Sequence, residues 1–558
     1  MSLQNLPKTW DLIIIGGGIT GAGIFREASQ RNLNVLLVEQ KDFAWGTSSR
    51  SSKLVHGGLR YLKEGQFLMA KIAVAERERL LKEVPGLVES LGFLLPIYED
   101  QSPGRRTMQL GLSLYDIMAR ERQHQYYDAE AFIQMVPHIN PNGLKGGFHF
   151  LDAQVDDARL VLRLIQESVA SGAYALNYTA VRQIDRNDNR QVVGVELEDV
   201  ETHEIKKVSS PAVINATGSW AEKLHPSPDP QRRLRPLRGS HLVFKAAAIP
   251  LNEGFCFMHP RDNRPVFMIP WEGAVLAGTT DLDHPQDLSI EPNITEAEVT
   301  YLMEGIQAIF PSLDISLTDC LCAFAGIRPV LSEGKLKPSE ESREHAVWGE
   351  YGLVTVTGGK LTTFRRLALD ALNAAKPYLP SDKMADRTVP VFSKVQQLPA
   401  LEYGLSMKTW RRLYGRYGSA ADTIVRTAKA DDLKTIKGTH TLWAELPYVA
   451  ENEQIRHLSD LMLRRVRIGL LTPHGGKAYL KRIQKLCKKV LPWNRRRWQK
   501  EIYLYQVQWN HAHALPIRRA EVLAQPKIIP FKTLRAVLSS VYYRFASGKK
   551  RKKSSGAT

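Results

Sequence analysis

The chain has 558 residues, of which 43% are hydrophobic and 24% are charged, and these fractions are those of a globular protein rather than a disordered or fibrous one. The length predicts two or three domains, because a single hydrophobic core stops growing well before this size. The 76 basic and 58 acidic residues leave a net charge of +18, which indicates an anionic partner: a phosphorylated substrate, a phospholipid surface or nucleic acid.

The four cysteines have no paired spacing, which argues against a disulfide framework and fits a reducing compartment. No zinc or redox-disulfide pattern is present, so no metal is expected. The N-terminal residues lack the apolar segment of a signal peptide, and no apolar run is long enough to span a bilayer. We therefore expect a cytoplasmic protein whose membrane contact, if any, is peripheral, at the inner face of the cell membrane.

The first fifty residues predict a βαβ unit at the start of a parallel sheet. Apolar runs at 12–15 and 35–38 flank a glycine loop and a helical stretch from about 20 to 31. Further strands of this sheet are expected from separated parts of the chain, at 192–195, 212–215 and 353–356.

The glycine loop Gly16-Gly17-Gly18-Ile19-Thr20-Gly21 matches the dinucleotide-binding pattern G-x-G-x-x-G. Gly16 permits the tight turn, Gly18 lets the backbone approach a pyrophosphate, and Gly21 lets helix and strand pack closely. Glu39 ends the second strand, where a carboxylate accepts the adenosine ribose hydroxyls and disfavours a 2′-phosphate. The alternative is a glycine turn in an ordinary α/β domain, and the pattern by itself fits FAD and NAD equally.

Two later glycine turns favour FAD, because three converging backbone segments suit the larger cofactor. The first is Ala216-Thr217-Gly218, and the second is residues 357–363, which include Gly359, Lys360, Leu361 and Thr362. The segments between these pieces contain strand-like stretches, such as 240–244 and 266–270, and are expected to form a substrate domain.

Residues 46–62, Gly-Thr-Ser-Ser-Arg-Ser-Ser-Lys-Leu-Val-His-Gly-Gly-Leu-Arg-Tyr-Leu, closely resemble the hallmark of FAD-dependent, aerobic-type glycerol-3-phosphate dehydrogenases. The resemblance covers about residues 10–375 and continues in order through 156–160, 239–241, 278–281, 326–329 and 358–363. Residues 461–469 resemble a motif of the family's helical C-terminal domain, and the match weakens beyond about residue 473.

The resemblance implies an α/β fold of the D-amino-acid-oxidase-like type, with a Rossmann-like FAD-binding domain interleaved with an α+β substrate domain built on a β-sheet. The expected FAD-binding domain is discontinuous, at 1–75, 151–220 and 326–390. The substrate domain is expected at 76–150 and 221–325, a helical domain at 391–510, and a basic extension at 511–558.

The function that the resemblance implies is oxidation of sn-glycerol 3-phosphate to dihydroxyacetone phosphate, with a hydride passing from C2 to flavin N5 and the electrons continuing to a membrane quinone. Three alternatives stay open. A glycerol-3-phosphate oxidase would use oxygen instead, and an amine or amino-acid oxidase would need a carboxylate clamp. An FAD-containing nucleic-acid-binding protein would use the basic tail, although no stacking platform of interleaved aromatics is apparent there. The sequence leaves the oligomeric state open, with a homodimer as one option.

The resemblance also implies that Arg60, Arg328 and Lys360 point into a substrate cavity beside the flavin, where arginine suits bidentate phosphate binding. Tyr61 would hydrogen-bond the substrate phosphate, although packing is equally compatible. His241 is the expected catalytic base, since a neutral imidazole near C2 can accept the O2 proton, and Arg328 joins it in the catalytic set.

His56 is a weaker candidate base, because its motif is expected against the isoalloxazine, and Asp281 is interpreted as a structural turn residue. The residues expected at the cofactor are Gly16, Gly18, Gly21, Glu39, Thr47, Ser48, Ser52, Lys53, His56, Gly57, Gly58, Gly218, Gly359, Lys360, Leu361 and Thr362.

A basic amphipathic helix is predicted over 477–491, followed by Trp493 and Trp498 among arginines. This combination suits an anionic membrane surface. The alternative is a helix packed on its own protein with a solvated basic face. The helical stretch 105–122 is interpreted as core or interface rather than as a membrane contact.

Overall fold

The computed structural model describes residues 3–63, 65–99, 101–121, 123–224, 234–332, 345–384, 389–394 and 403–517. The chain divides into two compact units, Met1–Ala514 and Leu515–Thr558, and all elements named below belong to the first unit.

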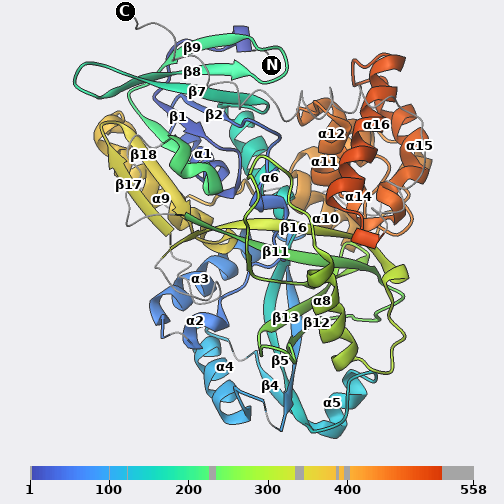
Figure 1. Cartoon of the computed structure of the whole chain (residues 1–558). Coiled ribbons are helices and arrows are strands. Elements are labelled where there is room, and N and C mark those ends of the chain that lie inside the picture. Colours follow the sequence, from blue (N-terminus) through green and yellow to red (C-terminus); the bar gives the residue numbers. More distant parts are fainter. Residues whose placement is uncertain are drawn as a thin grey trace, which may run out of the picture. The chain divides into compact units, whose positions relative to one another are not determined.

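Within the described residues, the strands form three sheets (Figure 1). The first has the strand order β17-β18-β10-β1-β2-β6, and all of its neighbours run parallel except the β17–β18 pair. Its strands are β1 (Leu12–Ile15), β2 (Val35–Val38), β6 (Tyr174–Leu176), β10 (Val213–Asn215), β17 (His345–Glu350) and β18 (Leu353–Gly358). The predicted βαβ unit is confirmed, as are the strands predicted near residues 212 and 353.

This parallel sheet is covered on both faces, which explains why its strands are apolar throughout rather than alternating. Leu12 and Ile14 of β1 belong to a core shared with three helices, whereas Ile13 and Ile15 pack towards the small third sheet. The three helices are α1 (Ile19–Ser29), α6 (Asp157–Ala170) and α9 (Phe364–Ala375).

The prediction that residues 192–195 add a strand to the parallel sheet is wrong. They begin β8 (Val192–Asp199), which pairs antiparallel with β7 (Thr179–Arg186) and β9 (Ile205–Ser209) in the third sheet. From Val195 onward buried and partly exposed residues alternate along β8, with Val195 and Leu197 buried, so this strand has one wet face and one dry face. A strand inside a doubly covered parallel sheet has no wet face.

The second sheet is larger and has the order β15-β11-β14-β13-β12-β3-β5-β4, with β16 pairing the other side of β11. Its strands are β3 (Val88–Tyr98), β4 (Gln125–Asp128), β5 (Leu144–Val155), β11 (Leu234–Lys245), β12 (Gly254–Met258), β13 (Pro265–Trp271), β14 (Ala274–Gly278), β15 (Leu282–Asp283) and β16 (Cys320–Leu331). The strands predicted at 240–244 and 266–270 are confirmed as parts of β11 and β13. Two of the expected domain boundaries, at 150/151 and 325/326, fall inside β5 and β16, because these long strands run on towards the parallel sheet.

Helices border the large sheet: α2 (Leu59–Lys63), α3 (Phe67–Glu83), α4 (Arg105–Ala119), α5 (Ala129–Met135) and α8 (Glu296–Ile309). The short α7 (Ala221–Leu224) instead contacts β18 of the parallel sheet. The predicted helix over 105–122 is confirmed as α4, which buries Met108, Leu112 and Tyr115. Among the described residues, no helix is both long enough and apolar enough to cross a membrane.

The C-terminal part of the first unit is helical, as expected. It contains α10 (Met407–Tyr417), α11 (Ala420–Arg426), α12 (Glu445–Asn452), α13 (Leu458–Asp460), a π-helical turn (Leu461–Arg465), α14 (Ile468–Leu471), α15 (Leu480–Cys487) and α16 (Arg495–Ala512). Figure 1 shows these helices grouped beside α6 and the ends of β11 and β16.

The interpretation of residues 477–491 as a membrane-binding helix is not supported. The helical part is the short α15, whose apolar residues Leu480, Ile483 and Cys487 are buried in the protein's own core. Trp498 is only 2% exposed, and its ring lies 4.8 Å from that of Trp493 in a T-shaped pair. The structure therefore shows the alternative: a packed helix with a solvated basic face.

Fully buried ion pairs join this helical region to the part of the chain that surrounds the parallel sheet. Asp42 follows β2, and its carboxylate accepts hydrogen bonds from Arg464 (2.5 Å) and from two nitrogens of Arg465 (2.6 and 2.8 Å). Burial alone would raise the pKa of Asp42, but the two guanidinium charges outweigh it and hold that pKa well below its usual range. A charge removed from this cluster would leave its partners buried and uncompensated.

Asp42→Ala is therefore expected to lower the free energy of unfolding by about 3–5 kcal/mol, measured by urea unfolding at neutral pH. Since the folded pKa of Asp42 is depressed, its contribution is complete above its unfolded pKa of about 4 and shrinks as the pH falls below that value. The control is Asp431→Asn, which breaks the pairs of an exposed carboxylate with Lys434 and Arg482 and should change nothing measurable. Equal stability of the two variants would contradict the assignment.

Candidate functional site

The glycine loop between β1 and α1 has the geometry that its sequence predicts. Gly16 has φ +113°, and a Cβ there would lie 2.5 Å from the Ala216 carbonyl oxygen. A Cβ on Gly21 would lie 1.8 Å from the Gly16 oxygen. Gly18 is the N-cap of α1, so the N–H groups of the helix start, which have no partner within the helix, face the loop. This is a ready-made site for a diphosphate.

Glu39 and Ser48 flank this helix start. The Glu39 carboxylate accepts hydrogen bonds from the backbone N–H of Gly17 (2.8 Å) and of Lys41 (2.9 Å), which fix it at the end of β2. Burial raises its pKa. The Ser48 hydroxyl accepts from the N–H of Ile19 at 2.9 Å, so it lies at the helix N-terminus beside Gly18.

The two later glycine turns meet the loop at the same edge of the parallel sheet. Gly218 follows β10 with φ +57°, and a Cβ there would have nothing within 4 Å. Gly359 follows β18 with φ +74°. The Thr357 hydroxyl donates to the Gly218 carbonyl at 3.2 Å, and that of Thr362 donates to the His56 carbonyl at 3.3 Å. The three predicted segments therefore lie together.

The segment 46–58 crosses from this edge to the large sheet and is held by buried contacts. The Thr47 hydroxyl donates to the Ile327 carbonyl of β16. Lys53 has φ +60° and is fully buried, with its ammonium 2.7 Å from both the Ser49 carbonyl and the Asp157 carboxylate. Lys53 is among the residues expected at the cofactor, and its side chain lies in the protein interior, paired with Asp157. We call residues 46–58 the flavin loop.

Gly57 and Gly58 end the flavin loop where no side chain would fit. A Cβ on Gly57 would lie 2.2 Å from the Tyr115 hydroxyl, and one on Gly58 would lie 2.2 Å from the Tyr61 ring. Tyr61 is buried, and the Lys360 ammonium lies 3.6 Å from the centre of its ring in a cation–π contact. The side chain of Arg60, the third expected phosphate ligand, lies outside the described part of the structure, although its backbone belongs to α2.

His241 lies on β11 between the two sheets. Its Nε2 is 2.9 Å from the Ser52 hydroxyl of the flavin loop, and its ring stacks on Phe324 of β16 at 4.8 Å. No described residue hydrogen-bonds its Nδ1. Burial, and then the charges of Lys53 and Arg328, hold its pKa well below the usual range, so this imidazole is neutral at physiological pH.

Arg328 is held by acidic and hydroxyl groups of the neighbouring turn. Its guanidinium donates to the Asp281 carboxylate at 2.7 Å and to the Thr279 hydroxyl at 3.2 Å. Arg264 approaches the other oxygen of Asp281 at 3.5 Å. Asp281 therefore orients a pair of arginines, which refines its interpretation as a turn residue, and Arg264 is a cation that the sequence did not single out.

A family model described as FAD dependent oxidoreductase matches residues 11–365, and one described as the C-terminal domain of alpha-glycerophosphate oxidase matches residues 385–498. The chain is 35% identical over 493 residues to the aerobic glycerol-3-phosphate dehydrogenase of Bacillus subtilis (strain 168), with 83% of this chain and 88% of the relative covered. It is 33% identical over 491 residues to the enzyme of that name in Staphylococcus haemolyticus (strain JCSC1435), covering 83% and 87%.

The chain belongs to the FAD-dependent glycerol-3-phosphate dehydrogenase family. The structure of the glycerol-3-phosphate dehydrogenase from Bacillus halodurans, complexed with FAD, superimposes with a TM-score of 0.69 and 26% identity, covering 90% of this chain and 95% of that one. The L-alpha-glycerophosphate oxidase of Mycoplasma pneumoniae, with a TM-score of 0.56 and 19% identity over 70% of this chain and all of that one, shares the fold. The expected D-amino-acid-oxidase-like architecture with a helical C-terminal region is thus confirmed.

FAD is the cofactor of this glycerol-3-phosphate dehydrogenase family member, and the residues present fit it. The α1 N-terminus with Gly18 and Ser48 suits the diphosphate, and the Glu39 carboxylate lies where a ribose is expected. The open space beside Gly218 leaves room for a part of the cofactor other than the diphosphate and the ribose. Sequence reasoning missed Arg264, just before β13, and Phe324 on β16, because neither has a local pattern of its own, and it assigned no role to Asp157, although the resemblance covers residues 156–160.

Gly21→Val tests the glycine loop. A side chain at residue 21 must displace the Gly16 carbonyl, so the purified variant is expected to lose most of its bound FAD, measured by its visible flavin absorbance. Gly104→Ala is the matched control, because a Cβ there meets nothing closer than 3.9 Å, and it should retain full flavin content. Normal flavin content in Gly21→Val would show that the loop does not bind the cofactor.

Proposed function

We propose that the protein oxidises sn-glycerol 3-phosphate to dihydroxyacetone phosphate and delivers the electrons to a membrane quinone. The observation that carries this proposal is the buried His241, whose depressed pKa suits a base, on a strand adjacent to the one that bears Arg328. The register supports it, because His241 lies opposite Phe324, four residues before Arg328 on β16. Bound FAD supplies the hydride acceptor for C2 of the substrate.

His241 would take the proton from the substrate O2 as the C2 hydrogen leaves. A general base must be unprotonated before it reacts, and the low pKa of His241 meets this condition. The Ser52 hydroxyl and the Phe324 ring fix the position of the imidazole. The reaction should therefore keep its full rate well into the acidic range and fall only when His241 becomes protonated.

The substrate phosphate needs cations that are already in place. Arg328 is oriented by Asp281, and Lys360 is held above Tyr61, so both charges are fixed before the substrate binds. The backbone of α2 places Arg60 next to Tyr61 in the chain. An amino-acid oxidase on the same fold would need cations for a carboxylate, whereas this number of cations suits a phosphate dianion.

The direct test is anaerobic titration of the purified flavoprotein with sn-glycerol 3-phosphate, in which the flavin absorbance should bleach. His241→Asn should reduce the first-order rate of bleaching by about 10²–10⁴-fold while FAD remains bound. His284→Asn is the control, because His284 is buried at the neighbouring strand end and its ring makes no hydrogen bond to any described residue. Absence of bleaching in the wild type would refute the proposed substrate.

Delivery of electrons to a membrane quinone requires a membrane-binding surface, and the apolar side of α15 is buried in the protein. Helices α3 and α4 provide another surface. Large apolar side chains stand exposed on these two neighbouring helices: Phe67 (53%), Leu68 (70%), Leu110 (65%) and Ile117 (72%). We call this surface the α3–α4 face. Lys71, Arg105 and Arg106 are exposed on the same helices and suit anionic headgroups.

The α3–α4 face also lies next to the flavin site. Helix α2, which carries Tyr61, packs against both α3 and α4 through Leu59 and Leu62 (Figure 1). A quinone that leaves the bilayer at this face would have a short path to the flavin. The helical stretch 105–122, interpreted from sequence as core or interface, contains α4, which has one face in the core and the other available to a membrane.

A Phe67→Ser/Leu68→Ser double variant is expected to lose most binding to anionic phospholipid vesicles and most quinone reduction in them, with reduction of a soluble dye unchanged. The matched control is Lys485→Gln/Lys488→Gln on α15, which should keep both activities. If only the α15 variant loses vesicle binding, the α3–α4 face is the wrong surface. Rapid peroxide formation with oxygen, independent of vesicles, would instead favour the oxidase.

A further inference from the structure

Two motifs of the family resemblance have no role in the proposed reaction: the acidic start of α6 and the arginine-rich turn near residue 465. The structure brings them together. Asp156 is the N-cap of α6 and Asp157 is its first residue. Arg467 donates to the Asp156 carboxylate at 3.0 and 3.1 Å and also forms an ion pair with Asp157. All three side chains are at most 1% exposed.

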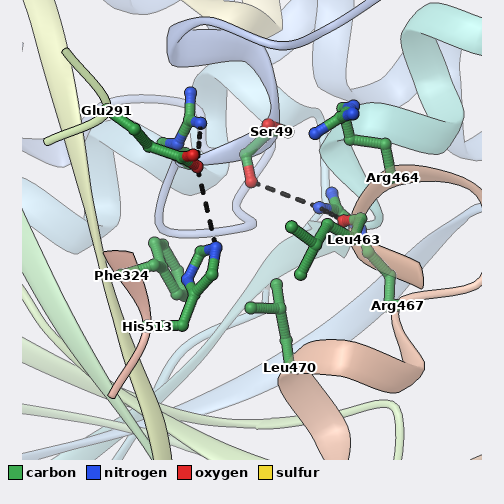
Figure 2. A pocket seen from close by; sticks show the side chains of 9 residues that line it. Ser49, Glu291, Phe324, Leu463, Arg464, Arg467, Leu470 and His513 are labelled. Carbon is green, nitrogen blue, oxygen red and sulfur yellow. Dashed lines mark hydrogen bonds and ion pairs between the residues drawn. The ribbon is translucent and has the colours of Figure 1, made fainter. Parts of the chain in front are cut away.

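Asp157 uses its second oxygen to hold the flavin loop. This Oδ2 accepts from the Ser51 N–H (3.0 Å), the Ser51 hydroxyl (2.6 Å) and the Lys53 ammonium (2.7 Å). Arg467 adds a hydrogen bond to the Ser49 carbonyl at 3.3 Å, which Figure 2 shows with Ser49 and Arg467 facing each other. The loop residues on both sides of Ser52 are therefore tied to one ion pair.

A second tie comes from α16 and the chain that follows it. Gln508 donates to Glu291 at 2.7 Å, and His513 lies 3.7 Å from the same carboxylate (Figure 2). Glu291 in turn pairs with Arg50 of the flavin loop at 2.5 Å. The helical region thus holds the flavin loop at two separate points. The loop backbone between these points has little freedom to move.

Ser52 lies between the held residues, and its hydroxyl contacts His241 Nε2. The Lys53 ammonium lies 4.8 Å from the centre of the Phe324 ring, and the His241 ring stacks on the same ring at 4.8 Å, so Phe324 contacts both the cation and the imidazole. Among the described residues, the charged groups packed around His241 are Lys53 from the loop and Arg328 from β16, with Asp157 and Asp281 as their counter-ions.

We propose that Asp157 and Arg467 are positioning residues, which hold the flavin loop so that Ser52 orients His241 and the Lys53 cation stays on the Phe324 ring against which His241 stacks. This inference rests on the proposed role of His241. It gives the helical C-terminal region a part in the reaction, although none of its side chains needs to touch substrate. The Asp157–Arg467 ion pair acts in this way because it is buried: away from water, its hydrogen bonds hold one fixed geometry and therefore fix the position of the loop.

The test uses full-length holoenzyme carrying Asp157→Asn, with Glu453→Gln as the matched control. Glu453 forms an equally buried ion pair between the helical region and α6, to Arg159, but makes no contact with the flavin loop. Both variants should melt at a lower temperature than wild type. Only Asp157→Asn should weaken FAD binding and lower the first-order rate of flavin reduction, each by about tenfold or more, with little change in the KM for sn-glycerol 3-phosphate.

A second variant, Lys53→Met, provides an independent measurement in case Asp157→Asn does not fold. Removal of a neighbouring positive charge favours the imidazolium, so the pKa of the base rises. In a plot of the reduction rate against pH, the fall of the rate at low pH should then occur at a pH about one unit or more higher than in the wild type. Glu453→Gln should leave this profile unchanged.

The inference is overturned if Asp157→Asn and Glu453→Gln differ in no property but melting temperature, or if Lys53→Met leaves the profile in place. Wild-type enzyme is titrated alongside. If it is not bleached by sn-glycerol 3-phosphate, the proposed function fails, and the FAD dissociation constants of the two variants still decide whether Asp157 positions the loop.

Discussion

The buried ion pairs between the arginines around residue 465 and the acids that follow β2 and begin α6 are the constraint on which the rest of this structure depends. Removing charges from water is costly, and that cost is recovered only when partners and geometry are fixed. Asp42, Asp156 and Asp157 each have such partners in Arg464, Arg465 or Arg467. These ion pairs therefore fix the position of the helical region against the FAD-binding side of the chain. The same pairs hold the flavin loop in place.

Close backbone approach is the second constraint, and it explains the distribution of glycines around the cofactor. The loop after β1 can face a diphosphate only because Gly16 and Gly21 carry no side chain where their backbones nearly touch. Gly57 and Gly58 play the corresponding role at the far end of the flavin loop, against Tyr115 and Tyr61. The flavin loop, which ends at these two glycines, is short enough for a few buried contacts to determine its path.

The charges at the site are divided between two tasks. Lys53, which is fully buried and paired with Asp157, acts on His241 through space, whereas Arg328 and Lys360 remain partly accessible for a phosphate. The charge of Lys53 thus acts on the base alone, whereas the charge of Arg328 lowers the pKa of His241 and would also bind the substrate. The basic α15, by contrast, is a solvated surface over a packed core, and its many cations carry no information about the reaction.

The sequence by itself determined the cofactor loop, the class of fold and most candidate residues, because each depends on a local pattern: a glycine spacing, an apolar run, or a motif in one stretch of chain. It could not place residues 192–195, since a run of valines looks the same in a parallel sheet and in an antiparallel one. Nor could it tell whether the apolar side of α15 faces lipid or protein, or that Lys53 lies inside. Only the tertiary structure decided these points, because burial and ion pairing depend on segments that are hundreds of residues apart, as Asp157 and Arg467 are.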